Sequence, residues 1–308
     1  MLDELLCGLE KQTFRSFEVI VIDDGSLDGS GDLARSWAIA GRPVRVFTGS
    51  GAGAVRAREM GVAEARGHIL AFIDSDCVPD PAWLQCAMEA FGTGADAVNG
   101  LTRPMRPLRP LERSMSSGEE GLYPTCNAFY RSELFARLGG FDVNAAARWR
   151  FRLTKRAKGL GFGEDTLLGW QAVRNGATVR FVPEVVVEHQ VFPRDFRDMS
   201  SRIAQVAAFP AMVKEIPELR VTLMQDGVFL GTRARLPLYL TVVALIAGRR
   251  RVAALAFCWW CISRVDSLRR SPYPLTEQLP WLPAEMLCDI AYATGLVAGS
   301  IQARSVVL

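Results

Sequence analysis

The stretch that decides the fold is Ile69-Leu70-Ala71-Phe72-Ile73-Asp74-Ser75-Asp76. Its β-branched and aromatic residues predict a buried strand that ends in two carboxylates, and the prolines of 77–81 predict that the strand stops there. Ligands of open α/β sheets bind outside the carboxyl ends of strands, and carboxylates at this spacing suit Mn²⁺ or Mg²⁺, which also hold phosphates. The alternative is that Asp76 only caps a helix starting near Pro81, or that the pair lies in a solvated turn.

Strands and helices alternate along the first hundred residues. Compact apolar runs predict the strands, and segments with helical periodicity predict the helices. The predicted strands cover 17–22, 44–48, 69–73 and 97–101, and the predicted helices cover 2–11, 33–40, 54–65 and 81–91. This order is typical of an α/β fold with a doubly wound, mainly parallel sheet and helices on both faces.

Beyond residue 101 the alternation becomes irregular. Further strands are predicted at 125–130, 179–182 and 185–187, with helices over 132–138 and from Gly163 onward. From about Asp195 the chain is predicted to be largely helical. We therefore expect two domains, a sheet domain over 1–192 and a helical region over 193–308.

Composition restricts the class of protein. The chain has 308 residues, 49% of them hydrophobic, and a net charge of +3, which is too small to indicate a nucleic-acid partner. Seven scattered cysteines without an amino-terminal signal peptide predict reduced thiols and a cytoplasmic location. The Cys258-x-x-Cys261 pair is interpreted as packing, because it lacks a second pair and a βαβ context.

Three acidic pairs follow predicted strands or open a helix. They are Asp23-Asp24, Asp74 with Asp76, and Glu164-Asp165. A divalent cation can neutralise a leaving oxygen, and one positioned carboxylate can take the proton of an attacking hydroxyl. Asp165 suits the second role, although carboxylates in the first turn of a helix are also favoured by its dipole.

Two basic segments have no assigned role from their residue types alone. The segment 103–110 alternates arginine and proline and is predicted to be an extended loop, either a solvated connector or a contact to phosphate or acceptor. The segment 148–158 is strongly basic, with six arginines and lysines.

The order of these motifs resembles the family-two glycosyltransferases, which have the GT-A fold. The resemblance covers about residues 5–190. The matching positions are Gln12-Thr13, 17–26, Ala57-Arg58-Glu59, 65–76, 127–131, Gly139-Gly140-Phe141-Asp142, Gly163-Glu164-Asp165 and His189.

The resemblance implies a role for each site residue. Asp24 would hydrogen-bond the nucleotide base of the donor, with Asp23 as its structural neighbour. Arg58 would lie near the diphosphate, or else remain a solvated helix residue. Asp76, helped by Asp74, would hold Mn²⁺ or Mg²⁺. Asp165, with Glu164 beside it, would be the catalytic base of an inverting displacement. The late His189 would either complete the metal site or be a satisfied surface residue.

The sequence departs from the family pattern in two places. The family begins with a strand and a loop that contacts the base, and here Met1 is followed almost directly by the first predicted helix, so that this strand is expected to be missing. In addition, Glu59 stands where the family usually has asparagine. Both departures affect base recognition more than metal binding.

The carboxyl-terminal third contains apolar segments at 236–247, 252–262 and 286–301, with Gly248-Arg249-Arg250-Arg251 between the first two. None reaches the length of about eighteen residues that a spanning helix needs. We expect these helices to lie against the inner face of the plasma membrane, where flanking arginines and Trp259, Trp260 and Trp281 favour an interface. The alternative is a helical bundle packed on the sheet or a dimer partner.

The sequence therefore predicts an inverting, metal-dependent glycosyltransferase. It would move a sugar from a nucleotide-sugar donor to a hydroxyl of a cell-envelope glycan or lipid-linked acceptor. A non-catalytic sugar-nucleotide-binding or scaffold protein is the main rival. A nucleotidyltransferase would want a glycine-rich basic loop after its first strand, and no such loop is visible.

Overall fold

The computed structural model describes residues 1–39, 44–150, 162–194, 196–230 and 233–308. The chain forms two compact units, and each is described by itself. The sheet unit comprises Met1–Met105, Ser114–Arg148 and Lys158–Gln190. The helical unit comprises Arg106–Arg113, Trp149–Ala157 and Val191–Leu308.

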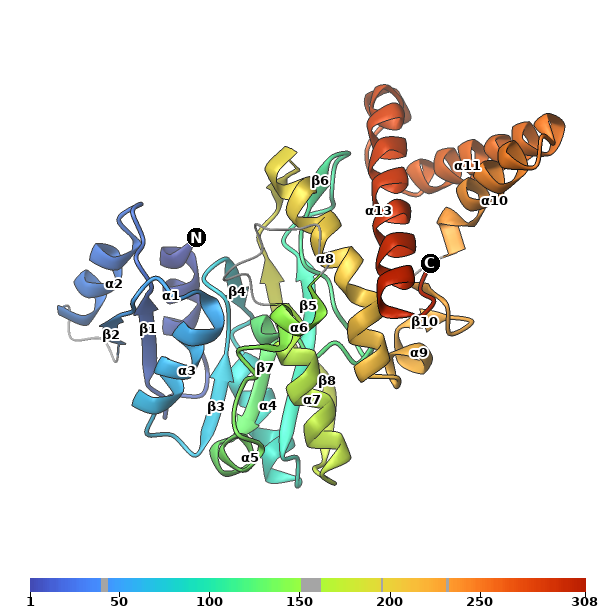
Figure 1. Ribbon diagram of the computed structural model, residues 1–308. Coiled ribbons are helices and arrows are strands. Elements are labelled where there is room, and N and C mark those ends of the chain that lie inside the picture. The colour runs from blue at the N-terminus through green and yellow to red at the C-terminus, as the bar shows by residue number, and fades with distance from the viewer. Residues whose placement is uncertain (40–43, 151–161, 195, 231–232) are drawn as a thin grey trace. The chain divides into compact units, whose positions relative to one another are not determined.

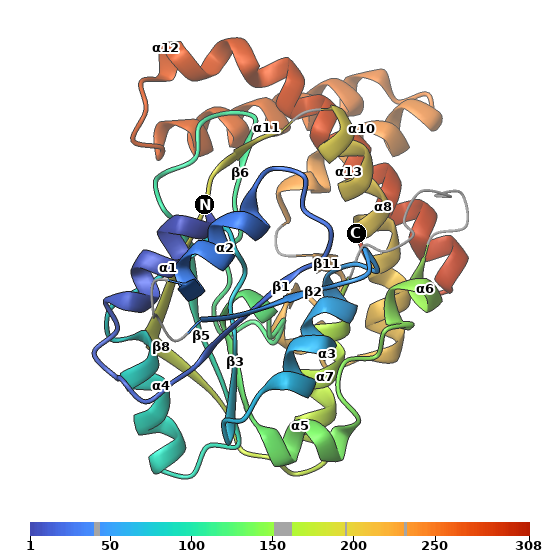
Figure 2. The ribbon, with the colours of Figure 1, turned by 90° about the vertical axis from the view of Figure 1, so that its left-hand side faces the viewer.

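The sheet unit begins with alternating helices and strands, as predicted. In this part the elements are α1 (Leu2–Glu10), β1 (Val19–Asp23), α2 (Ser30–Ile39), β2 (Val44–Thr48), α3 (Ala54–Glu64), β3 (Ile69–Phe72), β4 (Cys77–Pro79) and α4 (Trp83–Gly92). Strand β1 pairs in parallel with β2. Helix α3 packs beside β1 (Figure 2), with Gly61 facing Ile20 and Ile22.

The remaining elements of the sheet unit are β5 (Ala97–Pro104), β7 (Ala128–Arg131), α5 (Ser132–Leu138), α6 (Ala145–Trp149), α7 (Glu164–Arg174) and β8 (Val179–His189). A five-stranded sheet has the order β3-β7-β5-β8-β4 (Figure 1). Its core is aromatic and aliphatic, with Trp83 against Phe129 and with Tyr130, Leu134 and Phe135 fully covered.

The α/β fold class is confirmed, but the sheet is mixed rather than mainly parallel. Strands β3, β5 and β8 run in one direction, while β7 is antiparallel to β3 and β5, and β4 is antiparallel to β8. The strand–helix pattern gives the order of elements along the chain. It does not show that the long connection after β5 returns the chain into the sheet from the opposite end.

Local differences from the predicted elements have physical causes. The chain does form a strand after Asp76: β4 is an edge strand that ends at Pro79, a position where a missing amide hydrogen is tolerated. Residues Thr125–Asn127 form a 3₁₀ turn before β7. The two strands predicted within 179–187 are one strand, β8, whose register against β5 shifts between Gly100 and Leu101.

Gln12 anchors α1 to the start of α4. It is fully buried, and its side-chain amide donates to the carbonyls of Gly8 and Asp80 at 3.2 and 2.7 Å. Its side-chain oxygen accepts a hydrogen bond from the Leu84 amide at 3.0 Å. The Gln-Thr motif of the sequence therefore has a structural explanation.

The described part of the helical unit is dominated by long helices. Its longer elements are α8 (Phe196–Glu215), α10 (Leu236–Ile246), α11 (Arg250–Arg269) and α13 (Leu282–Ala303). Helices α8 and α13 lie side by side (Figure 1), and a Cβ on Gly299 would lie only 2.1 Å from the Ala207 carbonyl oxygen. Glycine at this position is what lets the two backbones approach so closely.

The shorter elements of the helical unit are β6 (Glu112–Arg113), β9 (Phe192–Pro193), α9 (Leu219–Thr222), β10 (Met224–Gln225), β11 (Phe229–Leu230) and α12 (Leu275–Gln278). Strand β6 pairs with β9, which ties the arginine–proline segment to this unit. The helical stretch Leu275–Ala303 is long and apolar enough to cross a membrane by length and composition, and 33% of its most apolar 18-residue window is buried. The helix is not interrupted at Asp289 or Gly299, and the stretch is longer than expected from the sequence because helical turns precede residue 286.

Candidate active site

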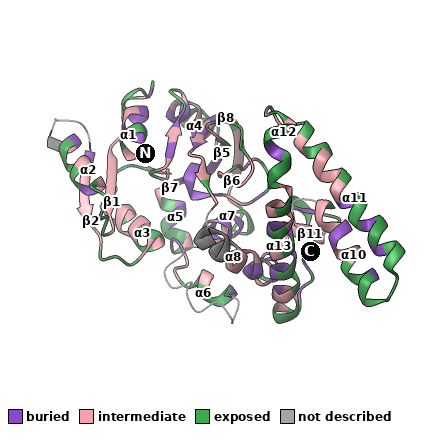
Figure 3. Ribbon diagram, turned by 90° about the horizontal axis from the view of Figure 1, so that it is seen from above, coloured by how far each residue is buried: buried purple, intermediate pink, exposed green. Residues whose placement is uncertain are grey.

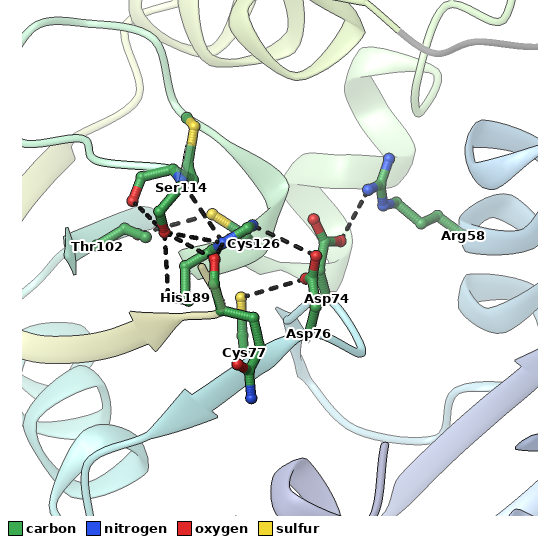
Figure 4. Close-up of polar contacts among 10 residues, drawn as sticks. Arg58, Asp74, Asp76, Cys77, Thr102, Ser114, Cys126 and His189 are labelled. Carbon is green, nitrogen blue, oxygen red and sulfur yellow. Dashed lines mark hydrogen bonds and ion pairs between the residues drawn. The ribbon is translucent and has the colours of Figure 1, made fainter. Parts of the chain in front are cut away.

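Asp76 and His189 meet because β4 and β8 are antiparallel neighbours. Cys77 lies opposite His189 in the register, and the Gln190 amide donates to the Asp76 carbonyl at 2.9 Å. As a result, His189 Nε2 lies 3.5 Å from Asp76 Oδ2 (Figure 4). His189 is 8% exposed, so that it is not a surface residue.

This pair, with the Cys77 sulfur, is a set of donor atoms that a metal ion could use. The three donor atoms lie within 4.8 Å of one another. A hydrogen bond with Cys126, together with burial, raises the pKa of the Cys77 thiol, and a protonated thiol is a poor ligand. The usable donors are therefore the Asp76 carboxylate and the His189 imidazole, a nitrogen–oxygen pair that fits Mn²⁺ better than the oxygen-preferring Mg²⁺.

Asp74 lies on the other side of the same turn and is paired with Arg58. Arg58 donates from one nitrogen to Asp74 Oδ1 at 2.9 Å and from another to Glu164 Oε1 at 3.3 Å (Figure 4 shows the first contact). Burial by itself would lower the pKa of Arg58, but the charge and hydrogen bond of Asp74, together with the charges of Asp165 and Glu164, outweigh burial and raise the pKa. Arg58 is thus an ion-paired residue that joins the end of β3 to the start of α7, and it is not a solvated helix residue.

Glu164 and Asp165 stand in the first turn of α7, and both carboxyl groups have a raised pKa. Burial, reinforced by the Asp165 charge, raises the pKa of Glu164 to about 7. Burial also raises the pKa of Asp165. The hydrogen bonds that its carboxylate accepts from the Thr166 and Thr125 amides, at 2.7 and 3.2 Å, lower this pKa but do not cancel the effect of burial. A carboxylate with a raised pKa is a stronger base than a free one, which is a property of catalytic bases.

Asp24 is engaged by the glycine-rich loop before α3. Its carboxylate accepts hydrogen bonds from the backbone amides of Gly51, Ala52 and Gly53 at 2.8, 3.3 and 2.7 Å. Asp23 turns the other way and accepts from the Ser26 amide at 2.9 Å. Since a carboxylate has about four acceptor positions, Asp24 retains little capacity beyond this loop.

Glu59, the residue that departs from the family pattern, has a structural role that the sequence did not reveal. Its Oε1 accepts a hydrogen bond from the Phe141 amide at 2.7 Å. A Cβ on Gly140 would lie 2.8 Å from the same carboxylate, which explains the glycine. The Gly-Gly-Phe-Asp motif is therefore fixed to α3 through Glu59.

The arginines of the 103–110 segment are all engaged in the described residues. Arg103 pairs with Glu188 at 2.9 Å, and Arg106 with Glu112 at 2.7 Å. Arg109 lies over the ring of Tyr273, 5.2 Å from its centroid. These contacts support the connector interpretation. Of the 148–158 segment, Arg148 pairs with Asp142, whereas residues 151–158 lie outside the described residues.

Solved structures with a similar fold are glycosyltransferases. The mannosyltransferase PcManGT from Pyrobaculum calidifontis, in complex with GDP-Man and Mn²⁺, has a TM-score of 0.54 at 16% identity and covers 98% of this chain and 82% of its own. TarS from S. aureus has a TM-score of 0.50 at 19% identity, covering 82% of this chain and 48% of its own. At these identities the likeness shows the GT-A fold.

Curated relatives match over part of their length. Glycosyltransferase AglE of Haloferax volcanii is 27% identical over 176 residues, covering 52% of this chain and 58% of that protein. Putative glycosyltransferase EpsH of Bacillus subtilis is 33% identical over 91 residues, covering 30% and 26%. The matches thus span less than two thirds of either relative. The model of the family described as Glycosyl transferase family 2 matches residues 1–156, half of the chain. The chain belongs to glycosyl transferase family 2.

Proposed function

We propose that this protein transfers a sugar from a nucleotide-sugar donor to a hydroxyl of a cell-envelope glycan or lipid-linked acceptor, with inversion at the anomeric carbon. The observation that carries the proposal is the approach of His189 Nε2 to Asp76 Oδ2 at 3.5 Å, created by the pairing of β4 with β8. The family and the fold agree with it.

Asp76 and His189 would hold a divalent cation, Mn²⁺ or Mg²⁺, and water would complete its coordination. The cation supplies charge neutralisation for the departing diphosphate. Asp74 would assist through Arg58 of α3, because it holds the guanidinium at 2.9 Å, beside the turn that carries Asp76, where it can meet a phosphate oxygen. A bound diphosphate would therefore compete with Asp74 for Arg58.

Asp165 is our candidate for the catalytic base. Its carboxyl is held by the Thr125 and Thr166 amides, and its raised pKa prepares it to take the proton of an acceptor hydroxyl. Glu164, held by Arg58, lies beside Asp165, and the negative charge of Asp165 favours the protonated form of Glu164. One base and one displacement imply inversion of the sugar.

Asp24 would act in donor binding mainly through the loop that it holds. With three backbone amides on its carboxylate, it fixes the loop Gly49–Gly53 at the end of β1, where a nucleotide base is expected to bind. Asp23 supports the adjoining turn through Ser26. A direct hydrogen bond from Asp24 to the base would use its remaining acceptor position.

The helical unit would bring the enzyme to a membrane surface. Helix α10 carries no charged residue and is apolar on all its faces, yet Val242, Val243 and Ile246 are exposed. A helix that is hydrophobic all round normally lies in a core or in lipid. The exposed arginines 249–251 at the turn to α11 would meet anionic headgroups, which favours an inner membrane leaflet near a lipid-linked acceptor.

The enzymatic proposal is tested by following Mn²⁺-dependent hydrolysis and transfer with a panel of nucleotide-sugars. We expect Asp76→Ala and Asp165→Asn each to reduce turnover by at least a hundredfold, about 3 kcal/mol of transition-state stabilisation. Asp32→Asn, which alters an exposed carboxylate on α2, is the matched control and should keep full activity. A parent protein that binds donor but turns it over no faster than Asp76→Ala would instead be a non-catalytic binding or scaffold protein.

A further inference from the structure

Ser114 occupies a position that neither the family pattern nor the acidic motifs indicate. It is the first residue of the sheet unit after the segment 106–113, and its hydroxyl lies against His189 (Figure 4). Ser114 Oγ is 3.2 Å from His189 Nδ1, 3.0 Å from the His189 carbonyl oxygen and 2.9 Å from the Gln190 carbonyl oxygen.

The hydrogen-bond donors and acceptors around Nδ1 indicate which ring nitrogen of His189 carries the proton. The Ser114 hydroxyl has one hydrogen, and the two carbonyl oxygens can only accept, so this hydrogen goes to one of them. The Oγ lone pairs then face Nδ1, and the Gln190 carbonyl oxygen is also 2.8 Å from Nδ1. Two hydrogen-bond acceptors, Ser114 Oγ and the Gln190 carbonyl oxygen, therefore lie close to Nδ1. The one donor that faces it, the Met115 amide, is farther away, at 3.5 Å.

With its proton on Nδ1, the imidazole presents a bare lone pair at Nε2. That nitrogen is the one that faces Asp76 Oδ2 across 3.5 Å. Two electron-rich atoms at this distance repel each other unless a proton or a metal ion lies between them. With its proton held on Nδ1, the neutral imidazole leaves Nε2 as a ligand atom.

We propose that Ser114 is a positioning residue for His189, which holds the ring orientation and the Nδ1–H tautomer that direct the Nε2 lone pair toward Asp76. The inference deepens the proposed function and rests on its assignment of Asp76 and His189 as ligands. Ser114 touches neither Asp76 nor donor; it acts through His189.

The backbone on both sides of the 106–113 segment contributes to the same positioning. The Met105 amide, at its start, donates to the His189 carbonyl at 3.0 Å, and Ser114 stands at its end. The segment itself is closed by hydrogen bonds from Arg106 to both Glu112 carboxylate oxygens at 2.7 and 2.8 Å. The residues that flank this segment, Met105 and Ser114, thus both hydrogen-bond to His189.

The test exploits the fact that the chain has only two histidines, His68 and His189. Long-range ¹H–¹⁵N spectra of the full chain labelled at histidine, with His68→Gln to assign the signals, report the tautomer without any metal. We expect one Nδ1–H form for His189 in the parent, the same form in Ser114→Thr, which keeps the hydroxyl, and a mixture of tautomers in Ser114→Ala.

Calorimetric titration with Mn²⁺ gives a second readout. Loss of a hydrogen-bond partner behind a metal-binding histidine typically weakens affinity by about tenfold or more, and we expect that loss in Ser114→Ala and recovery within about threefold in Ser114→Thr. Ser117→Ala is the matched control, because Ser117 is buried nearby and its hydroxyl has no hydrogen-bond partner in the described residues.

The outcomes separate this inference from the metal proposal. An unchanged His189 spectrum in Ser114→Ala, or a loss of Mn²⁺ affinity equal to that of Ser117→Ala, overturns the role of Ser114. A parent that binds no Mn²⁺, or binds it equally well as Asp76→Ala, overturns the metal proposal, while the spectra still decide whether Ser114 fixes the tautomer.

Discussion

Asp24, a candidate site residue, holds a backbone loop in place with its carboxylate. Its carboxylate collects three amides from Gly51, Ala52 and Gly53, and Gly53 is the residue that precedes α3. A Cβ on Gly49 would lie 2.3 Å from the same carboxylate, so that only glycine fits there. The glycine-rich loop is therefore shaped around one side chain.

Replacing Asp24 should release this loop. In Asp24→Ala the three amides lose a charged acceptor, and we expect about 1–3 kcal/mol less protection against local opening. Hydrogen exchange followed by mass spectrometry measures this directly, as faster exchange in peptides covering 49–54 and little change elsewhere. Asp32→Ala, on the exposed side of α2, is the control. Unchanged exchange at 49–54 in Asp24→Ala would contradict the structural role.

Glu164 should make the stability of the protein depend on pH. The pKa of its carboxyl is about 7 in the folded chain, against 4.5 for the free group. Below pH 4.5 the group is protonated in both states and contributes nothing. Between pH 4.5 and 7 it ionises only in the unfolded chain, so the free energy of unfolding falls, and one pKa unit corresponds to about 1.4 kcal/mol. The full loss is thus about 3 kcal/mol, reached above pH 7.

The matching variant is Glu164→Gln, which cannot ionise. Calorimetric melting temperatures of parent and variant are expected to be similar near pH 5, with the variant increasingly favoured up to pH 7 and a constant difference above it. Glu133→Gln, in the first turn of α5, controls for replacing a carboxylate at a helix start. A difference between Glu164→Gln and parent that does not change with pH would show that burial of Glu164 does not shift its pKa.

At the residue scale, the sequence predicted candidate site residues but not their partners. Asp74, Asp76, Glu164, Asp165 and His189 were proposed from the acidic motifs and the family resemblance, and their roles stay predictions. That Arg58 connects Asp74 to Glu164 and that His189 faces Asp76 depends on which strands are neighbours, and no local pattern contains that information. Ser114 and Glu59 were missed because a lone serine and a helix glutamate carry no signal without the fold.

At the scale of elements, the bulge between β5 and β8 is the most constrained point of the sheet. The register shifts after Gly100, and Asn127 spans the irregularity by donating to the Leu101 and Val185 carbonyls at 3.1 and 2.9 Å. This bulge aligns the end of β8, and hence His189, with β4. The sequence predicted two short strands here, since Pro183 and Glu184 interrupt the apolar pattern.

Gly100→Ala tests this constraint. A Cβ at residue 100 would lie 1.9 Å from the Val185 carbonyl oxygen and 2.6 Å from Asn127 Nδ2. We expect a loss of about 3 kcal/mol or more in the free energy of unfolding, or failure to accumulate as soluble protein. Gly92→Ala, at the end of α4 with open space around it, should be neutral or slightly stabilising. Equal melting temperatures for the two variants would mean that the bulge relaxes easily.

Helix periodicity was the most reliable signal at this scale. The predicted helices at 54–65 and 132–138 agree with α3 and α5 to within a residue. Strand direction was the least reliable, because an apolar run of five residues looks the same in either direction. The edge strand β4 was missed for a related reason: three residues ending in proline are too short to show alternation.

At the scale of the whole molecule, the helical unit exposes far more apolar surface than a water-soluble unit normally would. Much of the hairpin of α10 and α11 is exposed (Figure 3). Ile246 is 83% exposed, Leu255 72% and Ile262 69%. The arginines 249–251 at its turn are exposed, and among the described residues the ion pairs of this unit involve other arginines. The unit thus combines unshielded apolar area with unneutralised positive charge.

Binding of this hairpin to a lipid surface and binding to a protein partner predict different effects of substitutions. An anionic bilayer accepts the apolar side chains and attracts each arginine by about 1 kcal/mol. Replacing Arg249, Arg250 and Arg251 with serine should therefore weaken binding to anionic vesicles by roughly a hundredfold. Ile246→Asp with Leu255→Asp should abolish binding to anionic and neutral vesicles alike, because charged side chains cannot enter the interface without cost.

Flotation of the full chain with vesicles measures both effects, using phosphatidylcholine alone for the neutral surface and added phosphatidylglycerol for the anionic one. Because added salt screens charge, 0.5 M salt should weaken only the extra binding that the anionic lipid provides. Leu27→Asp, at a fully exposed leucine of the sheet unit, is the matched control and should float as the parent does. If the parent remains with the soluble fraction at low salt and sediments as a dimer that the Ile246→Asp, Leu255→Asp variant dissociates, the hairpin covers a second copy of the chain, and the membrane proposal is wrong.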